Sequence, residues 1–529
     1  VLDKLISGFT AISVTAQRVG IVGFSEDING NGITDNYSVE DLNSNGVLDD
    51  GEDKNGDGVL TFISEDSNSN GKLDSKFLFE GKDITFKFNN GKKWAGLIGP
   101  ATINFKESFK DFTEDTNGNG VLDLGEDRNL DGVINTQAFV IASGGNSAVY
   151  LDFESQILEV DVGLAQIQVS DFLYLRGGFK FSMQSNLNVV VNGGDFAPVM
   201  NLLKSGDDAT LRDDQIRMNV DGISLAATNL YGFVGIGGAP WQDLDQDGEI
   251  TGEAEKWANT NAQGVAILDA DIAMALMRPS LAQIPGVGAV LPKFISLKVN
   301  IDYAGLIGLE DIVTANLQDI QVNINTSVIP GLPPVGALLL ALPNIDYIAS
   351  FAGEDANNNF ILDEGEDLNL DGLLNRGMEI SSGLNAFYLD FDNEVLEVAG
   401  YAEFKLLGVI ELSAGFYMGK RIETVTLHDY VSGTDGTATT VSLSFAIIEA
   451  YGYIGEPSKD GHYWIDANAD GKITNEDGGA KTSDSVIGIA LEDLSIGFTV
   501  MRQTGVATWN DVSDETEIAL NVQGLLTVY

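Results

Sequence analysis

Apolar and polar residues alternate along most of this chain, in runs rich in branched and aromatic side chains. The runs ILEVDV (157–162), QIQVSDFLYL (166–175), FKFSM (179–183) and TVSLSFAII (440–448) are typical of β-strands, whose successive side chains point to opposite faces. Glycine, with 61 residues, separates the runs as turns do. Helical periodicity is scarce, and FAPVMNLLKSG (196–206) is the best short helix candidate. The pattern predicts an all-β fold.

Repetition organises the chain on a longer scale. The acidic segment EDTNGNGVLDLGEDRNLDGVIN (114–135) returns as EDANNNFILDEGEDLNLDGLLN (354–375). Each copy is followed by YLDF, by LEV and by two long alternating runs, and later matches keep the same order. One such match joins GVAILDADIAMALMR (264–278) to GIALEDLSIGFTVMR (488–502). The chain therefore contains more than one copy of a β-rich unit.

The matches divide the chain into two copies, residues 101–345 and 346–529, preceded by a partial copy in residues 1–100. In that partial copy, ISVTAQRVGIVGF (12–24) resembles ISLAATNLYGFVG (223–235). Repeating units bury their faces against their neighbours. We expect an elongated rod of tandem β-rich repeats, built as β-sandwiches or as a solenoid-like stack, and we interpret the chain as a segment of a longer array.

The acidic segments have oxygen-bearing residues at the spacing of a calcium loop. Calcium takes about six to eight oxygens, and this spacing bends the chain around one ion, with a glycine at position 6 and a carboxylate that closes the loop at position 12. Positions 1, 3, 5, 7, 9 and 12 of the first loop are Asp115, Asn117, Asn119, Val121, Asp123 and Glu126. A second loop follows at once, with Asp127, Asn129, Asp131, Val133 and Asn135.

The same spacing recurs in the rest of the chain, which gives ten candidate loops with no EF-hand helices beside them. Residues 1–100 contribute four loops, with Asp27, Asn29, Asn31 and Asp35; Asp41, Asn43, Asn45, Val47, Asp49 and Glu52; Asp53, Asn55, Asp57 and Val59; and Asp66, Asn68, Asn70, Lys72 and Asp74. Two loops stand alone, with Asp243, Asp245, Asp247 and Glu249, and with Asp466, Asn468, Asp470, Lys472 and Asp477. The second double loop has Asp355, Asn357, Asn359, Ile361, Asp363 and Glu366, then Asp367, Asn369, Asp371, Leu373 and Asn375. Phe360 replaces the glycine of position 6, so this loop is predicted to hold its ion less well.

Net charge supports a bound cation. The chain has 79 acidic and 29 basic residues, a formal net charge of -50. Ten calcium ions would add about +20 and leave about -30. The same charge argues against nucleic acid or an anionic membrane as a partner, because phosphates would be repelled. The alternative interpretation of the loops is a set of solvated Asp/Asn/Gly turns without an ion.

Strand-like flanks distinguish these loops from EF-hand domains, which place a helix on each side of the loop. The run from Asp27 to Asp74 resembles thrombospondin type 3 repeats, and the β body resembles the internal repeats of very large bacterial surface proteins of the adhesin and extracellular-matrix class. This resemblance implies bound Ca²⁺, an extracellular or cell-surface location, and a place in a filament, a surface layer or a biofilm matrix. Self-association and a surface or glycan ligand are the partners it implies.

Other chemistry is sparse. The absence of cysteine excludes disulfides and thiolate sites, and the two histidines, His428 and His462, form no catalytic constellation, so we predict that the chain is not an enzyme. Trp241 and Trp464 precede matched loops, where we expect them to cap a core rather than to stack on a glycan. The most apolar run (328–343) is too short and proline-rich for a membrane helix and reads as a buried loop.

Three functional hypotheses remain. The first is a calcium-stabilised structural or adhesive extracellular protein. The second is a calcium-dependent glycan-binding or polysaccharide-active protein, in which the ion would contact the ligand. The third is an outer-membrane β-barrel, suggested by runs such as FLYLRGGFKFSM (172–183) and disfavoured by long loops at unequal spacing.

Overall fold

The computed structural model describes most of the chain between Thr10 and Val528. The described residues are 10–25, 36–37, 63–64, 75–91, 102–123, 125–127, 134–142, 148–169, 172–205, 210–245, 249–280, 291–310, 312–332, 338–355, 359–363, 366–367, 372–380, 387–429, 431–459, 461–504 and 516–528.

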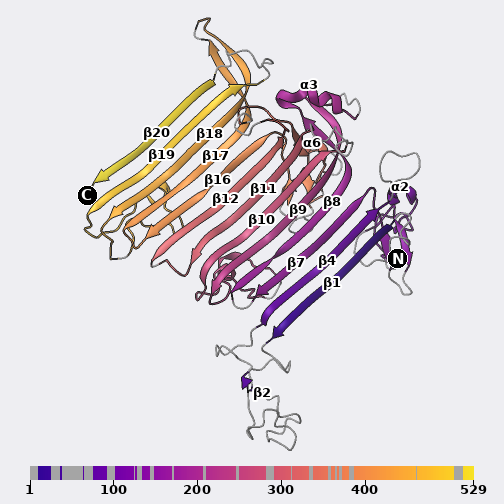
Figure 1. Ribbon diagram of the computed structural model, residues 1–529, viewed down its shortest axis with the longest axis horizontal. Coiled ribbons are helices and arrows are strands. Elements are labelled where there is room, and N and C mark those ends of the chain that lie inside the picture. Colours follow the sequence, from indigo (N-terminus) through magenta and orange to yellow (C-terminus); the bar gives the residue numbers. More distant parts are fainter. Residues whose placement is uncertain are drawn as a thin grey trace, which may run out of the picture.

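One large antiparallel sheet dominates the structure (Figure 1). Each long strand pairs with the next long strand in the sequence, in the order β1-β4-β7-β8-β9-β10-β11-β12-β16-β17-β18-β19-β20. The long strands are β1 (Thr10–Ser25), β4 (Ser75–Asn90), β7 (Ile157–Val169), β8 (Leu173–Asn192), β9 (Gln215–Ile236), β10 (Gln263–Pro279), β11 (Lys293–Ile307), β12 (Val313–Val328), β16 (Val395–Leu406), β17 (Ile410–Asp429), β18 (Thr434–Gly455), β19 (Gly488–Gln503) and β20 (Thr516–Val528). The predicted all-β fold is confirmed.

Short elements occupy the connections between these strands. The short strands are β2 (Asn36–Tyr37), β3 (Ile63–Ser64), β5 (Phe139–Ala142), β6 (Ala148–Leu151), β13 (Asn344–Asp346), β14 (Met378–Glu379) and β15 (Tyr388–Leu389). The helices are α2 (Phe105–Ser108), α3 (Ala197–Met200), α4 (Gly252–Lys256) and α6 (Tyr347–Ser350), with the 3-10 turns η1 (Gly194–Phe196), η2 (Asn201–Leu203) and η5 (Asn475–Asp477). The helix expected within residues 196–206 is therefore present as α3 with its flanking turns.

The described strands do not form the β-sandwich or solenoid-like stack that the repetition suggests. The last long strand of the first copy, β12, pairs with the first long strand of the second, β16, from Val313 opposite Leu406 to Asn325 opposite Val395. The two copies therefore continue a single sheet edge to edge. The layer that covers this sheet is made of loops and short elements rather than of a second large sheet.

Two buried asparagines show how the sheet repeats. Asn89 of β4 and Asn325 of β12 are both fully buried. The Asn89 Nδ2 donates to the carbonyls of Ile103 (2.9 Å) and Ser155 (2.8 Å). The Asn325 Nδ2 donates in the same way to the carbonyls that precede and follow the next acidic segment, at 2.8 and 2.9 Å. Strands β4 and β12 are thus equivalent, and the strand pattern repeats every six strands.

This period assigns β1, β11 and β20 to equivalent positions in the sheet. Ile12 of β1 lies opposite Phe88, the residue before Asn89, and Leu297 of β11 lies opposite Ile324, the residue before Asn325. Although the sequence of β1 resembles part of β9, its pairing makes it the counterpart of β11. The copies predicted over 101–345 and 346–529 each begin at an acidic double loop, and the described strands give no sharp boundary between them.

A row of β-bulges crosses the sheet at one level. Register shifts occur near this level between β7 and β8, β8 and β9, β9 and β10, β12 and β16, and in the strand pairs from β17 to β20. Bulge residues often take the left-handed conformation, which Asn and Asp tolerate best. Positive φ angles are found in the row at Asp83 (52°), Asn229 (47°), Asp269 (54°), Asp319 (48°), Glu449 (50°) and Asp493 (51°). The row places acidic side chains across the middle of the sheet.

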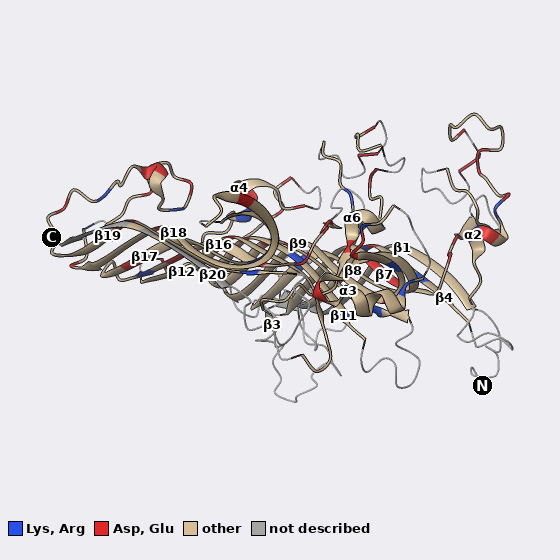
Figure 2. Cartoon of the chain, turned by 90° about the horizontal axis from the view of Figure 1, so that it is seen from above, with Lys and Arg blue, Asp and Glu red and all other residues tan. Residues whose placement is uncertain are grey.

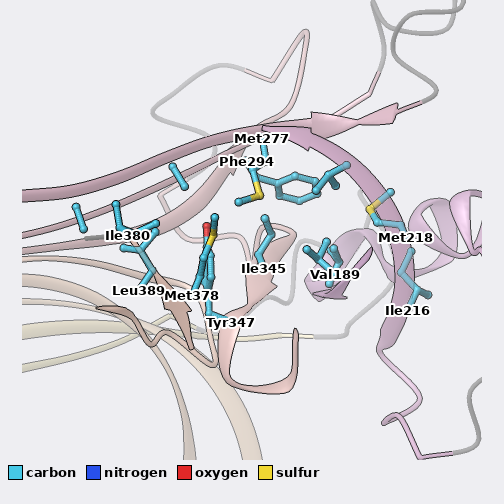
Figure 3. Packing of buried hydrophobic residues seen from close by; sticks show 14 of the residues in the cluster. Val189, Ile216, Met218, Met277, Phe294, Ile345, Tyr347, Met378, Ile380 and Leu389 are labelled. Atoms are coloured by element: carbon cyan, nitrogen blue, oxygen red, sulfur yellow. The ribbon is translucent and has the colours of Figure 1, made fainter. Parts of the chain in front are cut away.

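The hydrophobic core lies between one face of the sheet and the segments that cover it. Around α6, Ile345 and Tyr347 are fully buried against Met277 and Phe294 of the sheet (Figure 3). Two smaller clusters surround Trp241 and Trp464 under matched loops, where the rings pack on Tyr231 (5.4 Å) and Tyr451 (5.0 Å). Trp464 is only 2% exposed, and its Nε1 donates to the Gly452 carbonyl. The predicted capping role of both tryptophans is confirmed.

Side chains that alternate with this core point to the opposite face. Leu225, Val265 and Leu276 are 38–53% exposed there. In the apolar run 328–343, predicted as a buried loop, Ala341 and Leu342 are buried, whereas Val328 and Leu338 are 51% and 38% exposed. No helix in the described part of the chain is long and apolar enough to cross a membrane.

Candidate metal centres

Four acidic loops are described in enough detail to compare, and all rise from the same face of the sheet (Figure 2). We name them by their first carboxylate. The Asp115 loop (115–126) and the Asp355 loop (355–366) follow α2 and α6. The Asp243 loop (243–255) connects β9 to β10, and the Asp466 loop (466–477) connects β18 to β19.

The opening carboxylate folds the first half of the Asp115 loop. Asp115 Oδ1 accepts hydrogen bonds from the backbone N–H groups of Gly118 (2.7 Å) and Asn119 (3.0 Å), and Oδ2 accepts from Gly120 (2.8 Å). The φ angle of Gly120 is 74°, a left-handed conformation that glycine adopts without strain. This turn brings the side chains of positions 3, 5 and 9 together. The amide Nδ2 atoms of Asn117 and Asn119 lie 2.7 and 2.9 Å from one oxygen of Asp123.

The closing carboxylate, Glu126, joins the two halves of that loop. Its Oε1 accepts from the backbone N–H of Thr116 (2.9 Å), at position 2, and its Oε2 accepts from that of Asp123 (3.0 Å), at position 9. The Thr116 hydroxyl donates to the same Oε1 at 2.6 Å. These hydrogen bonds, that of the Thr116 hydroxyl first, lower the pKa of Glu126, so the closing group remains an anion at neutral pH.

The Asp466 loop repeats this design in the second copy. Asp466 Oδ2 accepts from the N–H of Gly471 (2.8 Å), whose φ is 83°. Asp477 closes the loop at position 12, because its two oxygens accept from the N–H groups of Ala467 (2.7 Å) and Thr474 (2.9 Å), at positions 2 and 9. Two loops from different copies therefore share one arrangement of carboxylates and backbone donors.

The Asp243 loop is closed by Glu255, which the sequence analysis missed. Glu255 Oε1 accepts from the N–H of Leu244 and Oε2 from that of Thr251, both at 2.7 Å, which are again positions 2 and 9. Carboxylate oxygens of Asp243, Asp245 and Glu255 lie within 4.8 Å of one another, as ligands of one metal ion would. Glu255 occupies position 13 rather than 12, on α4, so a fixed twelve-residue spacing overlooks it. Glu249 was predicted to offer a carbonyl, and nothing in the described geometry tests that role.

The Asp355 loop keeps the fold but departs where the sequence predicted. Phe360 takes the glycine position with a φ of 63°, a strained conformation for a large side chain. Its N–H lies 3.3–3.4 Å from the Asp355 oxygens, longer than the 2.8 Å of Gly120 to Asp115. Arg376 stacks its guanidinium over the Phe360 ring at 4.3 Å and places Nε 3.1 Å from an oxygen of the fully buried Asp355. A protein cation therefore stands against the opening carboxylate of this loop.

Both double loops are closed at their base by an additional glutamate. Glu114 Oε2 accepts from the backbone N–H (2.9 Å) and the side-chain Nδ2 (3.1 Å) of Asn135, and Glu354 makes the same two contacts with Asn375 at the same distances. The amides of Asn135 and Asn375, predicted as ligands, therefore face these glutamates. In the second loop of the later copy, Asp367 Oδ2 accepts from Gly372, as an opening carboxylate does.

The loops are attached to the row of bulges in the sheet. Lys256 at the end of the Asp243 loop places Nζ 3.0 Å from Asp269 and 2.5 Å from Asp302. Burial lowers the pKa of Lys256, but hydrogen bonds to these two carboxylates outweigh it and raise the pKa overall. Asn475 donates from its backbone to Glu449 (3.1 Å) and from its side chain to Asp493 (3.0 Å). The bulges therefore supply the acceptors that hold the loops down.

The Asp466 loop also reaches across the junction between copies. Lys472 forms an ion pair with Asp319 of β12, and Gln318 of the same strand donates to the Gly471 carbonyl at 3.1 Å. The N–H of Ile473 donates to the Tyr401 hydroxyl of β16 at 2.7 Å. A loop of the second copy is thus anchored on the last strand of the first.

The remaining predicted ligands lie outside the described residues. They are every ligand of the four loops between Asp27 and Asp74, together with Asn129, Asp131, Val133, Asp247, Asn357, Asn369 and Asp371. Where described, the position-7 residues Val121, Ile361 and Lys472 lie within their loops, and the N–H of each donates to the side-chain oxygen of position 5 at 2.7–2.9 Å. Asp127, Asp363 and Glu366 are described beside them, and Glu366 Oε2 accepts from Asp363 as Glu126 does from Asp123. Leu373 is described at position 7 of the Asp367 loop.

The donor set fits a hard divalent cation. Carboxylate and amide oxygens are the ligands that calcium prefers, and each compared loop gathers several of them around a turn. Amide Nδ2 atoms point at Asp123 in the Asp115 loop and at Asp363 in the Asp355 loop (2.6 Å), so the nearest partners of these anions are weak positive dipoles. Comparison with family models, curated proteins and solved structures gives no match to this chain.

Replacing Glu255 by glutamine is expected to loosen the Asp243 loop. The amides of Leu244 and Thr251 should exchange with solvent roughly tenfold faster, because each loses a charged acceptor. Glu253→Gln, on the same helix but exposed, is the matched control. Backbone hydrogen bonds, that of Thr251 first, lower the pKa of Glu255. The stabilisation that the Glu255 carboxylate gives the folded loop is therefore present at neutral pH and is lost as the pH falls through this lowered pKa. Equal exchange in both variants, measured by hydrogen-exchange NMR, would contradict the closing role.

Proposed function

We propose that this chain is a calcium-stabilised structural or adhesive protein of the cell exterior, in which ion-locked loops brace an extended β-sheet. The observation that carries the proposal is the Asp466 loop, which arises from the second copy and is anchored on β12 of the first through Lys472. An ion that rigidifies this loop would stiffen the junction between copies as well as the loop itself.

Charge is the second support. The sheet face that bears the loops is crossed by acidic bulge residues, and the formal net charge is -50. Calcium ligation would place positive charge where the repulsion is concentrated. In this role the carboxylates of each loop hold the ion, the backbone donors fix those carboxylates, and the lysines anchor the loops on the sheet. No catalytic step is required of any residue.

Calcium titration followed by chelation tests this function. We expect saturable binding of several ions and a higher melting temperature with calcium, since each site that binds only the folded chain adds about 2.7 kcal/mol at a hundred times its Kd. The rise in melting temperature with calcium should be smaller in Asp466→Asn. It should be unchanged in Asp435→Asn, which removes the same charge from an exposed site outside the loops. A melting curve that does not respond to calcium or chelator would refute the proposal.

A further inference from the structure

We propose that two copies of this chain form a dimer through the side of the sheet opposite to the acidic loops. We call this side the apolar face; it bears Leu225, Val265 and Leu276. In the dimer the two apolar faces pack on each other, so a β-sandwich forms between two molecules rather than within one. The inference goes beyond the proposed function, because it concerns the other side of the sheet and requires no ion.

Two rows of apolar side chains cross this face. The first runs from β4 to β19 through Ala227 and Met418, and each strand contributes alanine, valine, isoleucine, methionine or phenylalanine. The second runs from β4 to β17 through Ile267 and consists of apolar residues and one glycine. Leu225 and Val265 lie two residues from members of these rows and therefore point the same way. Neither row contains a charged side chain.

Large side chains on this face are exposed. In the first row, Met418, Phe445 and Phe498 are 39–44% exposed. Phe404 and Leu412, which lie opposite each other in β16 and β17, are 40% and 52% exposed. They border a hollow of about 420 Å³ whose lining includes four alanines. Large residues beside small ones give the ridges and hollows with which two packed sheets interdigitate.

The chain itself covers one end of the face. Lys420 donates to the carbonyl of Leu340 at 2.7 Å, and Arg502 donates to that of Leu339 at 2.6 Å. Residues 338–343 therefore lie against the far ends of β17 and β19. The exposed part of the face begins beyond this contact, at the level of Met418.

The area of the exposed part is that of a stable interface. Along β17 it extends from Leu412 to Met418, about 20 Å at about 3.4 Å per residue. Across the sheet, ten strand spacings separate β4 from β19, which is about 48 Å at about 4.8 Å each. The product is about 1,000 Å² per molecule, whereas a stable interface needs about 800 Å² per partner. The largest apolar patch of a typical monomer is only about 300–600 Å².

Shape and charge both favour a second copy as the partner. Sheets pack face to face about 10 Å apart, so the partner must offer an extended, uncharged apolar surface, and the same face of a second copy offers one. Each copy has a formal net charge of -50, and its acidic loops rise from the other face (Figure 2). Contact through the apolar faces leaves the loops on the two outer surfaces, whereas contact through the loops would bring carboxylates together.

Sedimentation equilibrium over a range of concentrations tests the dimer. We expect the mass to rise to twice that of the chain. Phe404→Lys combined with Phe445→Lys should raise the dissociation constant roughly a hundredfold or more, because the dimer must then bury unpaired ammonium groups. Added lysine also reduces the net negative charge, so a loss of dimer cannot be due to general repulsion. Val431→Lys, at a 98% exposed residue in the turn between β17 and β18, is the matched control.

Equal dissociation constants for the double variant and the Val431 variant would overturn the proposal, as would a monomer at every concentration. Circular dichroism establishes that each variant is folded. The substituted residues are already partly in water in the single molecule, so folding alone does not bury the new charges.

Thiol labelling locates the interface without a charged substitution, and the chain suits it because it contains no cysteine. Phe498→Cys places a thiol on the apolar face, and Thr499→Cys, the next residue of β19, places one on the opposite side. As the concentration rises, labelling at 498 should slow about tenfold, because a buried thiol reacts only from the free chain. Labelling at 499 should not change. Equal slowing at both positions, or slowing at neither, would contradict the face-to-face arrangement.

Vesicles and chelator complete the test. If the chain stays monomeric while phosphatidylcholine vesicles protect Phe498→Cys, the face binds lipid and the dimer is wrong. Sedimentation is repeated with calcium and with chelator to separate this inference from the proposed function. A dimer that persists in chelator supports the inference even if the calcium titration fails, and a dimer that forms only with calcium contradicts it.

Discussion

Replacing Lys420 by methionine is expected to lower the free energy of unfolding by about 3–5 kcal/mol, because it leaves a buried carboxylate without its counter-charge. The Lys420 Nζ lies 2.7 Å from Glu394 Oε1, and the side chains are only 4% and 1% exposed. The same ammonium donates to the Leu340 carbonyl at 2.7 Å, and Glu394 also accepts from Leu342 (2.9 Å). The pair therefore ties the loop after β12 to β17 of the second copy.

Two comparisons define this effect. Lys106→Met removes an exposed lysine from its exposed partner Glu154, the two side chains being 39% and 64% exposed, and should lower stability by less than about 1 kcal/mol. Adding Glu394→Gln to Lys420→Met should recover most of the loss, since no buried charge then remains. If urea unfolding shows equal losses of unfolding free energy for the two lysine variants, burial of the Lys420–Glu394 pair does not increase its contribution to stability.

The loss at Lys420 should also depend on pH. Burial raises the pKa of Glu394, and this rise is only partly offset by Lys420. Without the lysine that pKa rises further, so acidification neutralises the buried group and removes its penalty. The destabilisation of Lys420→Met should therefore shrink as the pH falls from neutral toward the raised pKa, and unfolding measured at a series of pH values checks this.

Giving the Asp355 loop the residues of its first-copy counterpart at positions 360 and 376 is expected to strengthen its calcium binding by about tenfold or more. Phe360→Gly removes the strain of a positive φ, which amounts to about 1–2 kcal/mol for a residue with a side chain, and about 1.4 kcal/mol is tenfold in affinity. Arg376→Thr installs the residue found at 136 and removes the guanidinium 3.1 Å from Asp355. The two changes are made singly and together, and the variants are compared with the unchanged chain in calcium-binding isotherms.

The reciprocal exchange is the matched control for that gain. Gly120→Phe with Thr136→Arg should weaken the Asp115 loop by a similar factor, because it introduces the same strain and the same competing cation. Binding that is unchanged in both exchanges would show that neither position controls the ion. A gain from Phe360→Gly alone, with none from Arg376→Thr, would assign the whole effect to the backbone.

Much of this fold could be predicted from the sequence, because alternation and turn residues are local signals. The long strands, α3 and the two capping tryptophans follow from them. Alternation shows that a strand has two different faces but does not show what covers them, so the sequence predicts a β-sandwich or a solenoid-like stack where loops form the second layer. The bulges at Asp83, Asp319 and Asp493 were missed, since one acidic residue within an apolar strand does not reveal that its neighbours carry bulges at the same level.

The candidate sites were predictable where spacing alone decides them. Glu126 and Asp477 close their loops from position 12 as the spacing indicates, and the departure at Phe360 has the expected effect on the backbone. Glu255 closes the Asp243 loop from position 13, because α4 turns its side chain back toward the loop. Arg376 contacts Asp355 although it lies ten residues beyond the end of the Asp355 loop. Both contacts depend on how the chain folds back on itself, which cannot be predicted from a fixed residue spacing.

The six-strand period has a consequence for scattering and imaging. Antiparallel strands lie about 4.8 Å apart, so six of them advance the sheet by about 29 Å. The strands keep nearly the same direction from β1 to β20 (Figure 1), so equivalent loops return on the same side after each period. Scattering from the sheet is therefore expected to show two length scales, a fine one set by the backbone and a coarse one near 29 Å set by its acidic loops.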